Sequence, residues 1–267
     1  MSEIRIAVAQ VPQSSNIERN LAKALNFIDK AAQNGVELLC FPETHIPGYR
    51  VGVLEPDAPC DTPALENALE IIRSRCKERS IGVIMGTETP NPDGKPFNSC
   101  VVIDENGEIL TVHHKSKLTP MDTLGYAQPE SGPSLFTFKG ITMGLVICFE
   151  GYRFPKTIHS LAEQGAQLVF HPQFNHVMHS MRWKLPVHES LLVARAAENT
   201  LWLITANMCH QNNNCRSMVI SPDGLVKEAS ILAVEILIIA DIDPSEATHA
   251  FLGKNADSRA KMLGERS

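Results

Sequence analysis

Stretches with the spacing of strands and stretches with the spacing of helices alternate along the chain from its start. Residues 4–9 alternate bulky apolar side chains with small or polar ones, a period of two that predicts a strand. The apolar positions of 17–28 then recur at helical spacing, and Gly35 follows as a helix stop. The apolar run 36–41 is typical of a strand buried on both faces. The same patterns predict helices at 63–79, 155–164 and 186–198, and strands at 81–85, 167–170 and 201–206.

Two further segments contain paired apolar runs joined by turn signals. Residues 101–112 are divided by Glu105-Asn-Gly107, and residues 135–147 are divided by Lys139-Gly140. Both patterns predict β-hairpins. Hairpins pair their strands antiparallel, whereas strand–helix–strand units favour parallel pairing. The sequence therefore predicts a layered α/β fold with mixed sheets.

Composition and charge exclude several classes of protein. The 267 residues carry a formal charge of −6 and no long block of Lys or Arg, which argues against a nucleic-acid surface. No glycine-rich phosphate loop follows a strand, so nucleotide-dependent chemistry has no motif to support it. The start lacks the features of a secretory signal, and the apolar run 231–240 contains Glu235 and is too short to span a bilayer. We expect a cytoplasmic protein with no membrane partner, folded as one domain. Its C-terminal tail at 244–267 packs either on its own subunit or on a partner subunit.

The seven cysteines are scattered, odd in number and never arranged as Cys-x-x-Cys. That usage fits neither a disulfide framework nor a zinc site. Most free cysteines are small buried hydrophobic residues. A chemical role for any one of them needs support from its neighbours.

Glu43 and Lys115 each follow a predicted strand. Glu43 lies in Cys40-Phe-Pro-Glu43, where a strand end delivers its carboxylate either as a general base or as an ordinary surface acid. Lys115 lies at the exit of the first hairpin, in His113-His114-Lys115, and either stabilises negative charge or is simply solvated. The two histidines raise the question of a metal. Adjacent strand residues point to opposite faces, however, and no third ligand stands at a regular offset.

Cys148 ends an apolar strand and is followed at once by polar and turn residues. This placement exposes a nucleophile at the rim of a sheet. A buried structural cysteine is expected inside the apolar run instead. A cysteine nucleophile needs a partner that accepts its proton, because a free thiol titrates near pH ~8.5.

The three segments, in this order and at these spacings, resemble the nitrilase superfamily of carbon–nitrogen hydrolases. Phe-Pro-Glu43 resembles the surroundings of the catalytic glutamate of that family, and Lys115-Ser-Lys-Leu-Thr-Pro those of its lysine. Ile-Cys148-Phe-Glu150, followed by Arg153-Phe-Pro, resembles the surroundings of its nucleophile. Similar stretches at 6–10, 194–199, 206–207 and 217–224 extend the resemblance over nearly the whole chain.

The resemblance implies an α-β-β-α sandwich of two mixed sheets that assembles as a homodimer or a higher homo-oligomer. It implies that Glu43 takes the thiol proton and Cys148 attacks a carbonyl or nitrile carbon. Lys115 and the backbone N–H of Phe149 then stabilise the oxyanion, and water hydrolyses the thioester. The resemblance implies no cofactor, and the placement of the two histidines does not favour a metal site.

Several positions depart from the pattern of the family. His113-His114 stands where Tyr-Arg is common, and Arg153 comes one residue late, although Glu150 keeps its usual place. Many members carry a second glutamate between the lysine and the cysteine. This sequence offers the shorter Asp122 there, with Thr123 or Glu130 as alternatives.

The substrate implied is a small aliphatic, ω-carboxylated or N-carbamoyl amide. A nitrile is the alternative within the class, and a catalytically silent binding protein is the alternative outside it. Arg153 either binds a substrate carboxylate or forms a structural salt bridge with Glu150 or Glu198. Phe174, in His171-Pro-Gln-Phe174, is expected to line the pocket beside the nucleophile.

Overall fold

The computed structural model describes residues 3–50, 61–92, 94–175, 181 and 183–252. Within them, the strands form two six-stranded sheets. The first sheet contains β1 (Ile4–Gln10), β2 (Leu38–Cys40), β3 (Gly82–Thr89), β4 (Phe97–Ile103), β5 (Ile109–His114) and β12 (Ile236–Ile242). The second contains β6 (Ser134–Phe138), β7 (Ile141–Leu145), β8 (Leu168–Gln173), β9 (Trp202–Asn207), β10 (Met218–Ile220) and β11 (Val226–Ala229).

Both sheets are mixed, as the sequence predicts. The first has the order β12-β1-β2-β3-β4-β5, with β1, β2 and β3 parallel and the other pairs antiparallel. The second has the order β11-β10-β9-β8-β7-β6, with β7, β8 and β9 parallel. The two predicted hairpins form β4–β5 and β6–β7.

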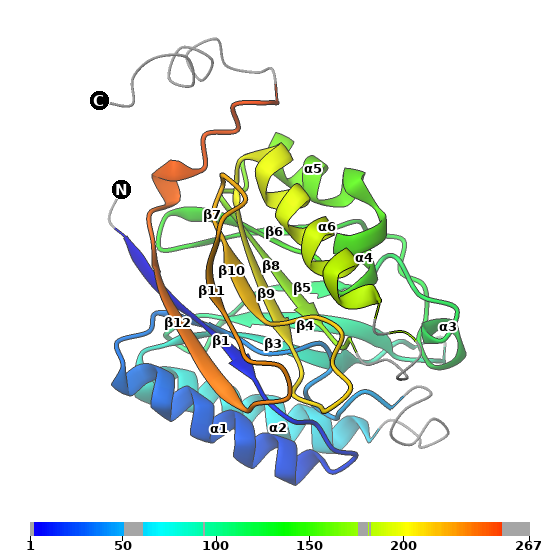
Figure 1. Ribbon diagram of the computed structural model, residues 1–267. Helices are drawn as coiled ribbons and strands as arrows, with labels where there is room; N and C mark the ends of the chain where they lie inside the picture. The colour runs from blue at the N-terminus through cyan, green and yellow to red at the C-terminus, as the bar shows by residue number, and fades with distance from the viewer. Residues whose placement is uncertain (1–2, 51–60, 93, 176–180, 182, 253–267) are drawn as a thin grey trace.

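Helices cover the outer faces of the two sheets and complete an α-β-β-α sandwich (Figure 1). α1 (Ile17–Gln33) and α2 (Thr62–Arg79) lie on the first sheet, and α5 (Pro155–Glu163) and α6 (Lys184–Asn199) lie on the second. Two short helices, α3 (Asp122–Gly125) and α4 (Phe149–Arg153), follow strands β5 and β7. This architecture is the one that the family resemblance implied.

The alternation along β1 shows how one strand serves two cores. Ile6 and Val8 face the second sheet in the central core, and each such burial contributes about 1.5–3 kcal/mol. Ala7 and Ala9 face the opposite way and pack against the helix layer of α1 and α2. Small side chains on that face let the helices approach the sheet closely.

The chain after β12 begins with a 3₁₀ turn, Pro244–Glu246, and residues 247–252 pack on the same subunit. The ring of His249 contacts the carbonyl of Ala166 at 2.8 Å, and the N–H of Ala250 donates to the hydroxyl of Thr200 at 2.8 Å. The rest of the predicted tail, 253–267, lies outside the described residues. No helix in the described ranges has the length and apolarity that crossing a membrane requires.

Candidate active site

Three segments that leave neighbouring strand ends bring Glu43, Lys115 and Cys148 together. Glu43 follows β2, Lys115 follows β5, and Cys148 follows β7 as the residue before α4. All three side chains are buried: Glu43 is 0% exposed, Lys115 1% and Cys148 8%. Two of the segments leave the first sheet and one leaves the second, so the site lies where the layers meet.

The ammonium of Lys115 binds two carboxylates. Its Nζ lies 2.6 Å from Oε1 of Glu43 and 2.9 Å from Oδ2 of Asp122. Glu43 also accepts hydrogen bonds from Nδ2 of Asn98 at 2.7 Å and from the backbone N–H of Phe174 at 2.8 Å. These bonds fix the position of both oxygens of the Glu43 carboxylate.

Asp122 is held as firmly as Glu43. The hydroxyl of Tyr49 donates to its Oδ1, and the backbone N–H of Thr119 donates to Oδ2 at 2.7 Å. The ring of Tyr49 stacks on that of Phe174, with the centroids 4.4 Å apart. Tyr49, Phe174, Tyr126 and Met208 form a separate apolar cluster beside the carboxylates.

The two carboxylates differ in their affinity for a proton. Burial raises the pKa of Glu43, the Asp122 charge raises it further, and Lys115 offsets only part of this. Burial also opposes ionisation of Asp122, but Lys115, Tyr49 and Thr119 outweigh it and lower the pKa of Asp122. Lys115 has a pKa well above its usual range, because the two carboxylates outweigh the effect of its burial.

Cys148 occupies a strained turn. Its φ is 47° and ψ is −106°, values that a residue with a Cβ rarely adopts and that recur at functional sites. Its N–H donates to the carbonyl of Pro172 at 2.9 Å, which ties the turn to β8. Burial and the charge of Glu43 raise the pKa of its thiol well above the usual value. Within the described residues, the N–H of Phe149 has no hydrogen-bond partner.

A model of the carbon–nitrogen hydrolase family matches residues 5–250. The chain belongs to the carbon–nitrogen hydrolase family. It is 27% identical over 256 residues to an (R)-stereoselective amidase of a Pseudomonas species, covering 93% of this chain and 88% of that protein. It is 28% identical over 257 residues to omega-amidase NIT2 of Bos taurus, covering 91% of this chain and 90% of that protein.

Solved structures share the fold of this carbon–nitrogen hydrolase. An amidase from Nesterenkonia sp. AN1, with the acetamide moiety of fluoroacetamide added covalently at its active-site cysteine, superposes with a TM-score of 0.81. The two chains are 22% identical, and the match covers 98% of this chain and 97% of that one. The same amidase in complex with butyramide gives a TM-score of 0.80 at 23% identity, over 98% of each chain.

Among the three candidates for the second acid of this hydrolase, Asp122 contacts Lys115. The hydroxyl of Thr123 donates instead to the carbonyl of Pro120, and Glu130 is exposed. The shorter side chain of Asp122 reaches the ammonium because Asp122 begins α3, which follows the lysine closely.

Arg153 forms neither of the salt bridges that the sequence suggests. Glu150 is bound by His113, with Nε2 2.8 Å from Oε2, and Glu198 is bound by Arg195 at 2.8 Å. Arg153 is exposed at the end of α4 and forms no ion pair within the described residues. The pKa of Lys184 is lowered, mainly by burial and further by the charge of Arg153.

The two adjacent histidines point to opposite faces of β5, as the alternation predicts. His113 faces Glu150, whereas His114 lies 2.8 Å from the hydroxyl of Ser99 and stacks on Phe97. Across the described ranges, no three His, Cys, Asp or Glu side chains gather in a group that could hold a metal ion.

Sequence reasoning missed three side chains that surround the site. Tyr49 binds Asp122, Asn98 binds Glu43, and the Nδ2 of Asn175 lies 4.0 Å from the Sγ of Cys148. Asn175 also donates to the hydroxyl of Tyr152 at 2.9 Å. Neither spacing nor polarity distinguishes these residues from ordinary loop and strand positions.

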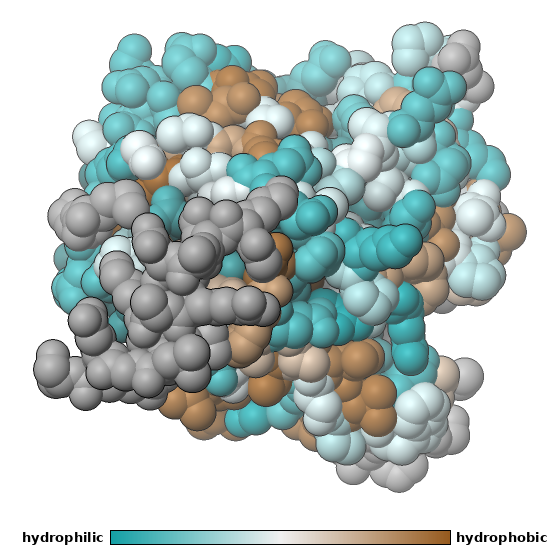
Figure 2. Space-filling model, turned by 90° about the horizontal axis from the view of Figure 1, so that it is seen from above, coloured by the Kyte–Doolittle hydropathy of each residue, from teal (hydrophilic) through white to brown (hydrophobic). Residues whose placement is uncertain are grey.

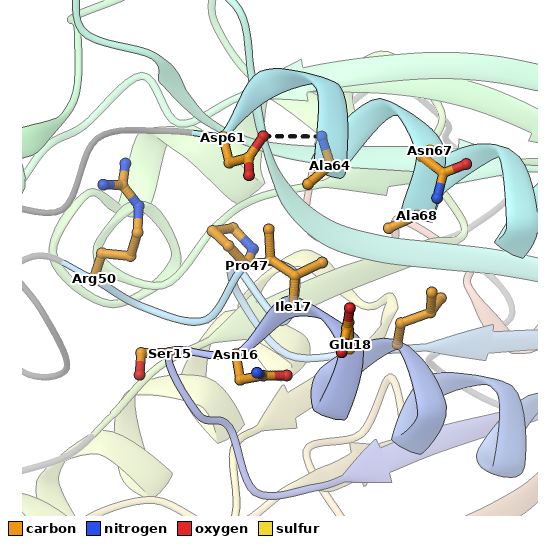
Figure 3. A pocket seen from close by; sticks show the side chains of 11 residues that line it. Ser15, Asn16, Ile17, Glu18, Pro47, Arg50, Asp61, Ala64, Asn67 and Ala68 are labelled. Atoms are coloured by element: carbon orange, nitrogen blue, oxygen red, sulfur yellow. Dashed lines mark hydrogen bonds between the residues drawn. The ribbon is translucent and has the colours of Figure 1, made fainter.

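A separate pocket of 430 Å³ opens between the first turns of α1 and α2 (Figure 3). Asn16 and Asp61, the residues that cap these helices, line it together with Pro47 and Arg50. The guanidinium of Arg50 is bound to Glu88 at 2.8 Å. This pocket lies in the helix layer and contains none of the residues of the Glu43–Lys115–Cys148 cluster.

Proposed function

We propose that this carbon–nitrogen hydrolase is an amidase that cleaves small amides through a thioester on Cys148. The observation that carries the proposal is the buried Lys115 shared by two carboxylates of opposite pKa shift beside a cysteine. Asp122 stays ionised and balances the charge of Lys115. Burial and the charge of Asp122 raise the pKa of Glu43, which is the direction that strengthens a general base.

In the proposed reaction, the thiol loses its proton to Glu43 as the sulfur of Cys148 attacks the amide carbon. The carbonyl oxygen becomes an oxyanion, which receives hydrogen bonds from Lys115 and from the free N–H of Phe149. The intermediate collapses, and protonated Glu43 gives its proton to the leaving amine. The products of this half-reaction are a thioester and ammonia or an amine.

The second half-reaction uses the same groups. Glu43 takes a proton from water, whose oxygen attacks the thioester carbon to form a second oxyanion. Collapse releases the carboxylic acid, and the sulfur of Cys148 recovers its proton from Glu43. No group outside the chain and its substrates is needed to balance these steps.

The test measures ammonia release from a panel of neutral amides, carbamoyl compounds and nitriles. We expect activity on amides, lost on Cys148→Ala and reduced about 10²–10⁴-fold on Glu43→Gln. Fluoroacetamide should add one acyl or alkyl group to Cys148, detected by mass spectrometry. Activity that survives Cys148→Ala contradicts the mechanism. Activity on nitriles alone makes the protein a nitrilase, and a folded protein inactive on the whole panel is a silent binding protein.

For the substrate class, we propose an amide that carries a carboxylate, as in ω-amides. Two cations, Arg153 and Lys184, lie close enough for the charge of Arg153 to lower the pKa of Lys184, and the charge of Cys148 also reaches Lys184. Neither cation has an ion pair within the described residues. The sequence from Phe174 to His188 contains no acid that could neutralise them. A guanidinium and an ammonium suit a carboxylate at this distance from the nucleophile.

The comparison of glutaramate with valeramide, a neutral amide of equal length, tests this class. We expect kcat/KM to be at least about 10-fold higher for glutaramate, and Lys184→Met to remove most of that preference without changing hydrolysis of valeramide. The matched control is Lys156→Met, on an exposed turn of α5. Equal kcat/KM for the two amides, with activity intact, contradicts the substrate class and leaves the amidase proposal standing.

We also propose that the chain acts as a homo-oligomer of one-domain subunits. Large apolar side chains are exposed at Leu225, Ile231 and Val234, near the edge of the second sheet. On the face seen from above, hydrophobic side chains form separate patches among hydrophilic ones (Figure 2). Such patches support burial against a second copy.

A further inference from the structure

His113 and Lys115 leave the same face of the β5 segment, because they are two residues apart. Both are buried, at 0% and 1% exposure. Lys115 meets the carboxylates of Glu43 and Asp122, whereas His113 meets that of Glu150 across the sandwich. The first sheet therefore makes two contacts with buried carboxylates at the site, and only that of Lys115 is used in the proposed reaction.

Glu150 lies two residues after Cys148 and joins both sides of the site. Its Oε1 accepts from the N–H of Ser116 at 2.7 Å and from the Ser116 hydroxyl at 2.5 Å. Its Oε2 accepts from the N–H of Ile147 at 2.6 Å and lies 2.8 Å from Nε2 of His113. Ser116 follows Lys115, and Ile147 precedes Cys148, so one carboxylate ties the lysine segment to the nucleophile turn.

Three groups that face the Glu150 carboxylate are donors, namely the N–H and hydroxyl of Ser116 and the N–H of Ile147, and His113 can be a fourth. With Nε2 of His113 carrying its proton toward Glu150, its Nδ1 accepts from the hydroxyl of Ser134 at 3.2 Å. Only an acceptor-only group satisfies four donors, and an ionised carboxylate is such a group. Burial opposes ionisation of Glu150, but His113 and these hydrogen bonds outweigh it, and the pKa of Glu150 is lowered.

We propose that His113 and Glu150 are positioning residues that set the Cys148 turn against the Lys115 segment across the two sheets. The inference rests on the proposed roles of Lys115 and Cys148. Neither His113 nor Glu150 has a hydrogen bond to Glu43, Lys115 or the sulfur of Cys148 within the described residues. They act by geometry, and a displacement of about 1 Å between nucleophile and oxyanion donor lowers a rate about 100-fold.

The central experiment compares His113→Leu with His114→Leu. The two variants remove adjacent histidines from one strand, and His114 binds Ser99 on the opposite face. We expect His113→Leu to lower kcat about 100-fold with little change in KM, and to slow alkylation of Cys148 by iodoacetamide, measured on the Cys148 peptide by mass spectrometry. We expect His114→Leu to keep both rates. A folded His113→Leu with both rates of the wild type overturns the proposal.

Two milder variants keep the test decisive if His113→Leu fails to fold. His113→Gln supplies an amide N–H to Glu150, and we expect it to recover most of kcat. Ser116→Ala removes one donor to Glu150 and leaves the backbone N–H, so we expect about a 10-fold loss of kcat at unchanged Tm. Wild-type kcat in Ser116→Ala overturns the proposal. If the wild type hydrolyses no amide, the amidase proposal fails, and the alkylation rates still decide this one.

Discussion

The side chain at the centre of the site is Lys115, because its ammonium divides its charge between two carboxylates. A single buried ammonium cannot neutralise both, so one carboxylate is left with excess negative charge. Tyr49 and Thr119 donate hydrogen bonds to Asp122, and these bonds together with Lys115 lower its pKa and favour the ionised carboxylate. Glu43 carries the excess, and that makes it the stronger base.

Substitution of Asp122 by Asn tests this division. The Asp122 charge raises the pKa of Glu43, so its removal lowers that pKa. In the proposed mechanism the rise of kcat/KM on the acid side follows deprotonation of Glu43, so this rise should move to lower pH in Asp122→Asn. The plateau should fall about 10-fold or more, because Glu43 becomes a weaker base. The measurement is a pH profile of kcat/KM, with Asp122→Glu as the charge-preserving control. An acid limb that stays in place in Asp122→Asn contradicts the assignment of the base.

At the scale of single residues, the sequence predicted those site residues that lie in recognisable local motifs. Glu43, Lys115 and Cys148 each follow a predicted strand end in a distinctive tripeptide, and the structure brings the three together. Tyr49 and Asn98 could not be predicted. Their contacts depend on how a loop and a strand far apart in sequence lie in space, and hydrophobic periodicity carries no information on that.

The element that most constrains the site is β3, because Gly86 of this strand packs directly against the backbone of the Glu43 segment. The N–H of Ile46 donates to the carbonyl of Gly86 at 3.1 Å. A Cβ at Gly86 would lie 2.0 Å from the carbonyl oxygen of Pro42 and 2.7 Å from the backbone nitrogen of Thr44. Because those atoms belong to the backbone, no side-chain rotation relieves the clash. The absence of a side chain at Gly86 therefore allows the backbone of the Glu43 segment to lie close against β3.

Gly86→Ala should destabilise the protein by about 3 kcal/mol and remove most of the activity, since Glu43 must move away from Lys115. Urea unfolding and ammonia release measure the two effects. Gly132→Ala is the control, because Gly132 is exposed and a Cβ there meets no atom within 4 Å. We expect Gly132→Ala to stay within about 0.5 kcal/mol of the wild type. A Gly86→Ala variant as stable and active as that control contradicts this role of β3.

Elements were predicted well where apolar periodicity is long, and poorly where buried strands become polar. β4 begins at Phe97, before the predicted start at 101, because the polar residues Asn98 and Ser99 are buried and hydrogen-bonded, Asn98 to Glu43 and Ser99 to His114. β8 runs on to Gln173 for the same reason. The helices α3 and α4 are too short for a periodic signal. The apolar pattern therefore stops where these strands begin to carry buried, hydrogen-bonded polar side chains.

For the whole molecule, the sequence predicted the layers but not the contacts between them. Mixed sheets follow from hairpins beside strand–helix–strand units. Each turn signal between two apolar runs predicts that those two strands pair antiparallel. The bond from Glu150 to Ser116 joins segments from opposite sheets, and no local pattern encodes it. Such contacts follow from the closure of the sandwich, which the central core of both sheets drives.

Each sheet is built from one continuous half of the chain, except that β12 returns to pair with β1. Glu43 and Lys115 come from the first half, and Cys148 comes from the second. During synthesis, Glu43 and Lys115 leave the ribosome well before Cys148, and β12, which completes the first sheet, is the last of the described strands to emerge. A growing chain therefore holds Glu43 and Lys115 without Cys148, and it cannot complete the first sheet until well after Cys148 has emerged. The candidate site can therefore assemble only after segments from both halves of the chain have emerged.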